Sequence, residues 1–172
     1  MDFNAFLFGL SKAPVKVIAP SVDFGDYVSI DLSTNTKALK DFDTTCSNSW
    51  IVYINQYLQS RNKCIAFGGY LESRSIYNRS NYFNSKSALE TRNIHLGIDL
   101  WCAAETLVLA AFDGVVHSFK NNTNHGDYGP TIILKHCIDS VTFYTLYGHL
   151  SRLSIKTLSK NRQVVKEQTI GW

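Results

Sequence analysis

The sequence predicts a mainly β protein of the α+β class, in which an antiparallel β-sheet domain follows an N-terminal extension that contains a helix. Tyrosine and phenylalanine are abundant, with 9 and 10 residues, whereas proline occurs only 3 times, a composition that favours strands. The second half of the chain alternates short apolar runs with turn-forming residues, as antiparallel strands do. The first half contains a segment with clear helical periodicity.

The N-terminal extension, residues 1–90, begins with two short apolar runs that favour strands, residues 15–20 and 27–32. Residues 47–62 differ, because their large apolar side chains recur at i, i+1, i+4, i+7 and i+8: Trp50, Ile51, Ile54, Tyr57 and Leu58. Ser47 or Asn48 can cap the start of this helix, and Asn62 can end it. We expect the apolar stripe to pack against the sheet.

Residues 64–72 return to strand character, interrupted at Gly68-Gly69, and residues 73–92 are polar and predict an extended surface loop. The second domain, residues 91–172, is predicted to be built from antiparallel strands. A turn is expected at Asp113-Gly114 and a long loop over residues 121–129. The expected strands cover residues 94–101, 107–119, 131–138, 141–150 and 162–172.

Charge and hydropathy exclude several classes of partner. The formal net charge is only +3 and the basic residues are scattered, so nothing indicates a nucleic-acid partner. No apolar run is long enough to span a membrane, and residues 1–10 lack the basic start and long apolar run of a secretory signal. We therefore expect a cytoplasmic protein without a membrane anchor, and no partner protein is evident. The four widely spaced cysteines are expected to be buried, reduced thiols: Cys46, Cys64, Cys102 and Cys137.

The stretch NIHLGIDLW, residues 93–101, carries an imidazole and a carboxylate on one strand face, with a glycine midway between them. On an ideal strand the Cα atoms of His95 and Asp99 would lie roughly 13 Å apart, too far for two ligands of one ion. Gly97 can adopt dihedral angles that bend the chain and bring the two side chains together. His-x-Gly-x-Asp is therefore a possible half of a metal site, and the alternative is an ordinary surface strand.

The other histidines have weaker sequence contexts. His149 follows Gly148 and shares a strand face with Phe143, Thr145 and Tyr147, so it is either a site residue or a structural histidine. His117 and His136 lie inside sheet segments, and His125 lies in the loop over residues 121–129. The sequence contains no G-x-S-x-G elbow, phosphate-binding glycine loop or H-E-x-x-H helix, and no base is evident beside Cys102.

The order of these motifs resembles the lysostaphin-type, LytM-like zinc metallopeptidase family. The resemblance runs from about residue 92 to 172 and rests on H-L-G-I-D-L-W, G-V-V, D-Y-G-P-T-I-I-L-K-H and F-Y-T-L-Y-G-H-L-S. It implies that His95 and Asp99 are zinc ligands and that His149 is the non-ligand histidine that assists catalysis. It also implies an antiparallel β fold with the metal on the floor of a groove, and hydrolysis of short peptide links, those of peptidoglycan.

The sequence departs from that family's pattern at three places. The family's third zinc ligand belongs to an H-x-H motif after a Q-x-I-G strand, and here Q-T-I-G-W forms residues 168–172. Glu105 and Glu167 stand where the family has glycine, and each costs about 1 kcal/mol if its φ is positive. We therefore expect a metallopeptidase domain that is incomplete at its C-terminus.

These departures leave alternatives to a working peptidase. The main one is a non-catalytic, peptide-binding module of the same fold, with Tyr128 and Tyr147 lining the groove. His136 or His125 could in principle replace the missing ligand. The absence of a secretory signal also leaves open an enzyme that acts on a small substrate outside the cell wall.

Overall fold

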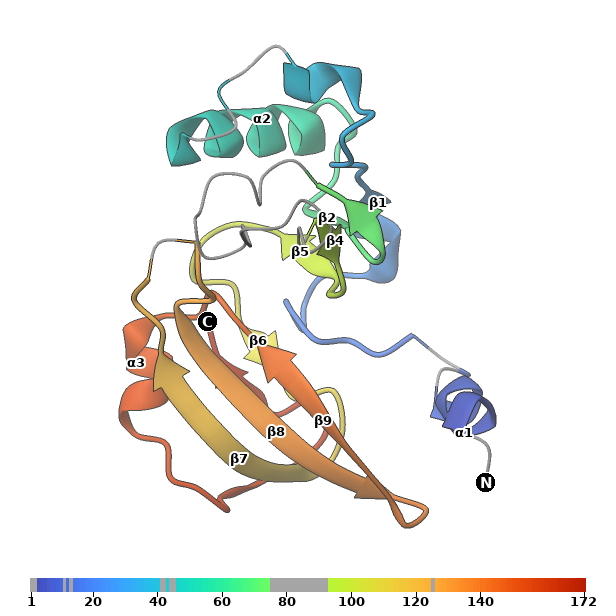
Figure 1. Ribbon diagram of the computed structural model, residues 1–172, viewed down its shortest axis with the longest axis vertical. Helices are drawn as coiled ribbons and strands as arrows, with labels where there is room; N and C mark the ends of the chain where they lie inside the picture. Colours follow the sequence, from blue (N-terminus) through green and yellow to red (C-terminus); the bar gives the residue numbers. More distant parts are fainter. Residues whose placement is uncertain are drawn as a thin grey trace, which may run out of the picture. The chain divides into compact units, whose positions relative to one another are not determined.

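The computed structural model describes residues 3–10, 12, 14–40, 43, 46–74, 93–124 and 126–172. From residue 75 on, the loop predicted over residues 73–92 lies outside the described residues, as does His125. The chain divides into two compact units (Figure 1). Unit 1 contains residues 1–21, 105–123 and 128–172, and unit 2 contains residues 22–104 and 124–127. The predicted domain boundary between residues 90 and 91 stays a prediction.

Unit 2 is built around a three-stranded sheet with the order β1-β2-β5. Its strands are β1 (Tyr27–Ser29), β2 (Ile65–Gly68) and β5 (Asp99–Trp101), and the short 3-10 helices η1 (Phe24–Asp26) and η2 (Lys37–Lys40) belong to the same unit. Strands β1 and β2 are parallel and are joined through helix α2 (Ser47–Gln59), whereas β2 and β5 are antiparallel. This β-α-β connection was not predicted, because alternation within a short strand does not reveal its partner.

Helix α2 is the helix that the apolar stripe predicted. Trp50, Ile54 and Leu58 are buried in a core with residues of β1 and β2, and the Trp50 ring stacks on that of Trp101 at 5.7 Å. Of the other two residues of the stripe, Tyr57 is half-buried and Ile51 is exposed. The stripe therefore identified the buried face of the helix to within one residue.

The two ends of α2 differ in how well the sequence predicted them. The N-cap residue is Cys46, not Ser47 or Asn48, and no side-chain cap hydrogen bond forms there. At the other end Asn62 takes a φ of 50°, and the backbone N–H groups of Asn62 and Lys63 donate to the carbonyls of Gln59 and Leu58. This is a Schellman closure, which asparagine tolerates better than most residues. Asn62 ends the helix as predicted.

Unit 1 contains a four-stranded antiparallel sheet with the order β10-β7-β8-β9 and a second sheet of two strands, β11-β6. The long strands β7 (Gly114–Asn121), β8 (Pro130–Ile138) and β9 (Val141–Tyr147) dominate this unit in Figure 1. Its core draws on both sheets, and Ile155 of the short helix α3 (Arg152–Lys156) packs against it. The buried core residues are Ala110, Val116, Ile132, Leu134, Leu150, Val164 and Ile170. The other strands are β6 (Val108–Leu109), β10 (Gln163–Val164) and β11 (Thr169–Gly171). The predicted fold class, mainly antiparallel β with N-terminal helices, is confirmed.

Two predicted elements of unit 1 take a different form. Residues 15–20 contribute one isolated bridge, between Ile18 and Val108, instead of a regular strand. The bend before β7 covers residues 111–113, and β6 and β7 on either side of it belong to different sheets. The chain thus turns near Asp113-Gly114, but this turn does not close a hairpin.

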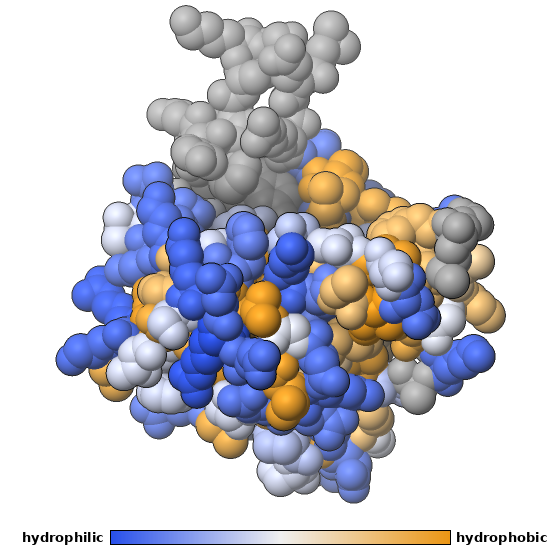
Figure 2. Space-filling view, turned by 90° about the horizontal axis from the view of Figure 1, so that it is seen from below, coloured by the Kyte–Doolittle hydropathy of each residue, from blue (hydrophilic) through white to orange (hydrophobic). Residues whose placement is uncertain are grey.

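Helix α1 (Phe3–Leu10) exposes much of its apolar surface. Phe6 is buried and meets the ring of Phe143 at 5.7 Å, whereas Phe3, Leu7 and Phe8 are exposed. Figure 2 shows hydrophobic side chains gathered at the right of the view, the side on which α1 lies in Figure 1. Among the described residues, no helix has the length and apolar character needed to span a bilayer.

The four cysteines are free thiols, as expected, but the prediction that they are buried was wrong. Cys64 and Cys137 are exposed, and Cys46 and Cys102 are partly exposed. Cys64 directly precedes β2, and Cys137 lies on β8 at a position opposite to the buried His136 face. An apolar neighbourhood in the sequence therefore did not indicate burial, because alternate residues of a strand face opposite sides.

Glu105 and Glu167 both occupy left-handed backbone conformations, with φ of 65° and 64°. We expect Glu105→Gly and Glu167→Gly each to raise the free energy of unfolding by about 0.5–1 kcal/mol, because glycine adopts positive φ without a Cβ clash. Thermal unfolding followed by circular dichroism measures this. Lys166→Gly is the matched control, since Lys166 has an ordinary φ and should lose stability on the same change. A lower midpoint for both glutamate variants would contradict the prediction.

Candidate metal centre

His95 and Asp99 lie on two short strands of one interrupted antiparallel ladder. Strand β5 pairs with β2, and β4 (Ile94–His95) pairs with β3 (Glu72–Ser73). The register is the same on both sides of the interruption, with Asp99 opposite Gly68 and His95 opposite Glu72. Residues 69–71 and 96–98 form the interruption, so both strands leave the regular ladder over three residues and then rejoin it.

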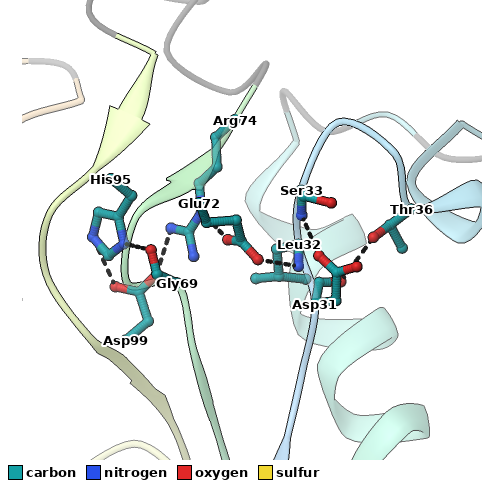
Figure 3. A network of polar contacts seen from close by, with 9 residues as sticks. All are labelled: Asp31, Leu32, Ser33, Thr36, Gly69, Glu72, Arg74, His95 and Asp99. Carbon is teal, nitrogen blue, oxygen red and sulfur yellow. Dashed lines mark hydrogen bonds and ion pairs between the residues drawn. The ribbon is translucent and has the colours of Figure 1, made fainter.

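This interruption brings the imidazole and the carboxylate together. The Nε2 atom of His95 lies 3.5 Å from Oδ1 of Asp99, and both side chains are partly buried (Figure 3). Two ligand atoms of one tetrahedral zinc ion, each ~2.0–2.2 Å from the metal, would lie about 3.3–3.5 Å apart. The pair therefore has the separation of two ligands of one ion, which an unbroken strand could not give.

Two glycines make room for the His95 ring. A Cβ at Gly97 would lie 3.2 Å from Nε2 of His95. Gly69 has a φ of +97°, and a Cβ there would lie 2.6 Å from Nδ1 of His95 and would overlap Nη2 of Arg74. Gly97 thus allows the close approach of the ring, and Gly69 meets a second requirement, a backbone conformation that other residues rarely adopt.

A hydrogen bond on the far side of the His95 ring orients it. Nδ1 of His95 lies 3.0 Å from the carbonyl oxygen of Gly69. Because a carbonyl can only accept, Nδ1 is the donor in this bond, and Nε2 is the ring nitrogen that faces Oδ1 of Asp99. An imidazole nitrogen and a carboxylate oxygen at a separation of 3.5 Å suit a shared cation.

Arg74 holds the other oxygen of Asp99. Its Nη1 donates to Oδ2 of Asp99 and its Nε donates to Oε2 of Glu72, each at 2.5 Å. Oε1 of Glu72 accepts from the backbone N–H of Leu32 at 2.7 Å. These bonds connect the loop after β1 to the metal-facing carboxylate (Figure 3).

Charge and burial have opposite effects on Arg74, which lies between the carboxylates of Asp99 and Glu72. Burial alone would lower the pKa of the Arg74 guanidinium, but the charges of Asp99 and Glu72 and their hydrogen bonds outweigh burial and raise it. Further out, the backbone N–H and hydroxyl of Ser33 lower the pKa of Asp31. One arginine between two carboxylates leaves one net negative charge beside the His95 ring, which favours a bound cation.

His149 belongs to unit 1 and lies beyond the end of β9, where its φ is 57°. Its backbone N–H donates to the carbonyl of Tyr128 at 2.7 Å, its side chain is exposed, and its ring lies 6.2 Å from that of Tyr128. Tyr128 also packs against Gly148, where a Cβ would lie 3.1 Å from the tyrosine ring. The expected strand face does not continue to His149, because β9 ends at Tyr147.

His136 is a structural histidine and not a replacement ligand. It is fully buried, Nδ1 donates to the carbonyl of Asp113 at 2.8 Å, and Nε2 is hydrogen-bonded to Thr145 Oγ1 at 2.7 Å. Thr145 continues to the hydroxyl of Tyr147, which accepts from the N–H of Ala111. Both ring nitrogens of His136 are therefore already used inside unit 1.

Gly69, Glu72 and Arg74 were missed as site residues. The Gly68-Gly69 doublet was interpreted only as an interruption of a strand. Glu72 and Arg74 are two residues apart, the spacing that puts side chains on one strand face, and they flank a predicted strand end. That spacing could have predicted that the two charged side chains lie together. It could not predict which other residues they contact.

Residues 93–172 match the sequence family described as Peptidase family M23, which includes the lysostaphin- and LytM-type peptidases. Neither the comparison with curated proteins nor that with solved structures gave a match. The matched segment begins at Asn93, so it contains His95, Asp99 and His149. Gly69, Glu72 and Arg74, which hold the first two, precede it.

Proposed function

Because residues 93–172 form a Peptidase family M23 domain, from a family of zinc metallopeptidases that cleave peptidoglycan cross-links, we propose that this chain is a zinc-dependent endopeptidase unit. Its proposed substrates are short peptide links, those of peptidoglycan. The observation that carries the proposal is the His95–Asp99 pair, whose facing ligand atoms lie 3.5 Å apart. The second support is the hydrogen bond between Nδ1 and the Gly69 carbonyl, which leaves Nε2 as the ring nitrogen available to a metal.

In this proposal His95 would hold zinc through Nε2 and Asp99 through Oδ1. A bound zinc ion supplies Lewis-acid polarisation of a peptide carbonyl and lowers the pKa of water towards neutrality. His149 would donate a hydrogen bond to the carbonyl oxygen as negative charge develops, or transfer a proton to the leaving amine. Its exposed ring supports that role, because a proton-transfer group must reach the substrate.

A second candidate is a non-catalytic peptide-binding module of the same fold. Within the described parts of the chain, no cluster of three or more His, Cys, Asp or Glu side chains could hold a metal. Two protein ligands should bind zinc much more weakly than three, since water replaces the third. In this alternative, Tyr128 and the backbone near Gly148 would contact an extended peptide without cleaving it.

We expect His95→Ala and Asp99→Ala each to weaken zinc binding by about 100-fold or more, because each removes half of the protein ligand pair. The measurement is competition for zinc against a chromophoric chelator, combined with cleavage of glycine- and alanine-containing cross-bridge peptides. His117→Ala is the matched control, since it removes an exposed histidine of β7 that lies outside the pair.

Three outcomes separate the hypotheses. Zinc binding that depends on both residues, together with peptide cleavage, supports the peptidase. Zinc-dependent or zinc-independent peptide binding without cleavage supports the module. If wild type and both variants bind zinc equally, the proposed ligand pair is wrong.

A further inference from the structure

Arg74 is placed to fix the geometry of the metal-facing carboxylate. It occupies Oδ2 of Asp99, so only Oδ1 faces Nε2 of His95. A carboxylate with both oxygens free can rotate and bind a metal through either oxygen or through both. The Arg74 hydrogen bond removes that freedom before any metal arrives.

Arg74 is itself held firmly. Its side chain is only 9 % exposed, and Nε donates to Glu72, whose other oxygen accepts from the N–H of Leu32. The backbone N–H of Arg74 donates to the carbonyl of Asn93 at 2.8 Å, next to β4. A long flexible side chain is thus fixed at its backbone and at two guanidinium nitrogens, so it can transmit a defined position to Asp99.

A fixed orientation of the Asp99 carboxylate would favour metal binding. Oδ1 of Asp99 and Nε2 of His95 face one another at 3.5 Å. Without the bond from Arg74 to Oδ2, the carboxylate could rotate and present either oxygen to the ring. Holding the two acceptors in place beforehand reduces the reorganisation needed when a cation binds.

We propose that Arg74, supported by Glu72, is a positioning residue that holds Asp99 as a one-oxygen metal ligand facing His95. This inference rests on the proposed zinc site. It also gives Leu32, Glu72 and Arg74 a role, because these residues, which precede the M23 match, then supply the outer support of that domain's metal ligands. The opposing interpretation is a salt bridge that only stabilises the pairing of β3 with β4.

The test uses the 172-residue chain. The zinc dissociation constant of each variant is measured at a temperature well below the midpoint of its thermal unfolding. Arg74→Lys keeps the charge but loses the two-pronged hydrogen bonding of the guanidinium, and Arg74→Met removes both. We expect both variants to bind zinc about 10- to 100-fold more weakly than wild type, the usual effect of losing an outer partner of a ligand. Glu72→Gln should show a smaller loss, because Arg74 remains but loses one anchor.

Cobalt(II) absorption supplies a readout that a purely structural role would not change. Asp99 freed from Arg74 can bind through both oxygens, so the visible bands of the cobalt-loaded Arg74→Lys variant should shift from those of wild type. Methylguanidinium added to Arg74→Ala should restore part of the zinc affinity, and sodium chloride at equal ionic strength should not. Arg61→Met is the matched control, since Arg61 lies over the Tyr57 ring at the end of α2 and outside this network.

The results distinguish this inference from the proposed zinc site. If wild type binds zinc, His95→Ala and Asp99→Ala lose it, and the two Arg74 variants stay within about threefold of wild type with unchanged cobalt bands, Arg74 is not a positioning residue. If wild type binds no zinc, the zinc site fails and the inference fails with it. Should Arg74→Met not fold, Arg74→Lys and Glu72→Gln decide the question.

Discussion

Replacement of Gly69 by alanine is expected to destabilise unit 2 by about 2–6 kcal/mol and to weaken zinc binding. The φ of +97° is poorly suited to any residue with a Cβ, which costs about 1–3 kcal/mol. The added Cβ would also lie 2.6 Å from Nδ1 of His95 and overlap Nη2 of Arg74, so overpacking adds about 1–3 kcal/mol. Relief of this overlap moves the ring or the guanidinium, and either movement disturbs the ligand pair.

Gly129→Ala is the matched control for Gly69→Ala. Gly129 also has a positive φ, +61°, but a Cβ there would meet nothing within 4 Å. Gly129→Ala should lower the free energy of unfolding by only about 1 kcal/mol, the cost of the backbone conformation alone. The near-ultraviolet circular dichroism of the stacked Trp50–Trp101 pair reports the unfolding of unit 2, and far-ultraviolet circular dichroism follows the strands of unit 1, where Gly129 lies. Equal losses for the two variants would show that the space beside His95 and Arg74 is not limiting.

His136→Leu is expected to lower the free energy of unfolding of unit 1 by about 2–5 kcal/mol. Leucine has a similar volume and fits an apolar site, but it leaves the Asp113 carbonyl and the Thr145 hydroxyl without their partner. Each buried polar group that loses its hydrogen bond costs about 1–3 kcal/mol. The rings of Phe112 and Phe143, both within 6 Å of the His136 ring, would keep water from replacing those bonds.

His117→Leu serves as the control for this prediction, because His117 lies exposed on β7, where its ring meets Ser118 and the edge of Tyr144. It should change stability by less than about 1 kcal/mol. Denaturant unfolding of the two variants in parallel measures the difference. A loss for His136→Leu no greater than that for His117→Leu would mean that the buried polar chain contributes little to stability.

The bend at the metal pair could be predicted because its cause is local. Gly97 lies between His95 and Asp99 in the sequence, and glycine is the residue that permits close approach to a backbone. The prediction required only the length of an ideal strand and the separation of two ligands on one ion. The structure places Nε2 and Oδ1 3.5 Å apart, but the glycine with a positive φ in this ladder is Gly69 and not Gly97.

The support of the pair could not be predicted in the same way, because it depends on a pairing between distant segments. Gly69 and Arg74 reach His95 and Asp99 only because β2 and β3 pair with β5 and β4, more than twenty residues further along the chain. Register sets which side chains meet, and a shift of one residue would turn Glu72 to the other face. The sequence of residues 64–74 does not indicate the register in which β2 and β3 pair with β5 and β4.

The sequence by itself determined the antiparallel β character of the second half, the helix at residues 47–59, its end at Asn62 and the bend that joins an imidazole to a carboxylate. Each depends on side chains that are neighbours along the chain or within one turn of a helix. Only the tertiary structure decided the parallel pairing of β1 with β2, the exposure of the cysteines, the burial of His136 and the contact of Arg74 with Asp99. These depend on which face of one element meets another, and that choice is made by the packing of the whole unit.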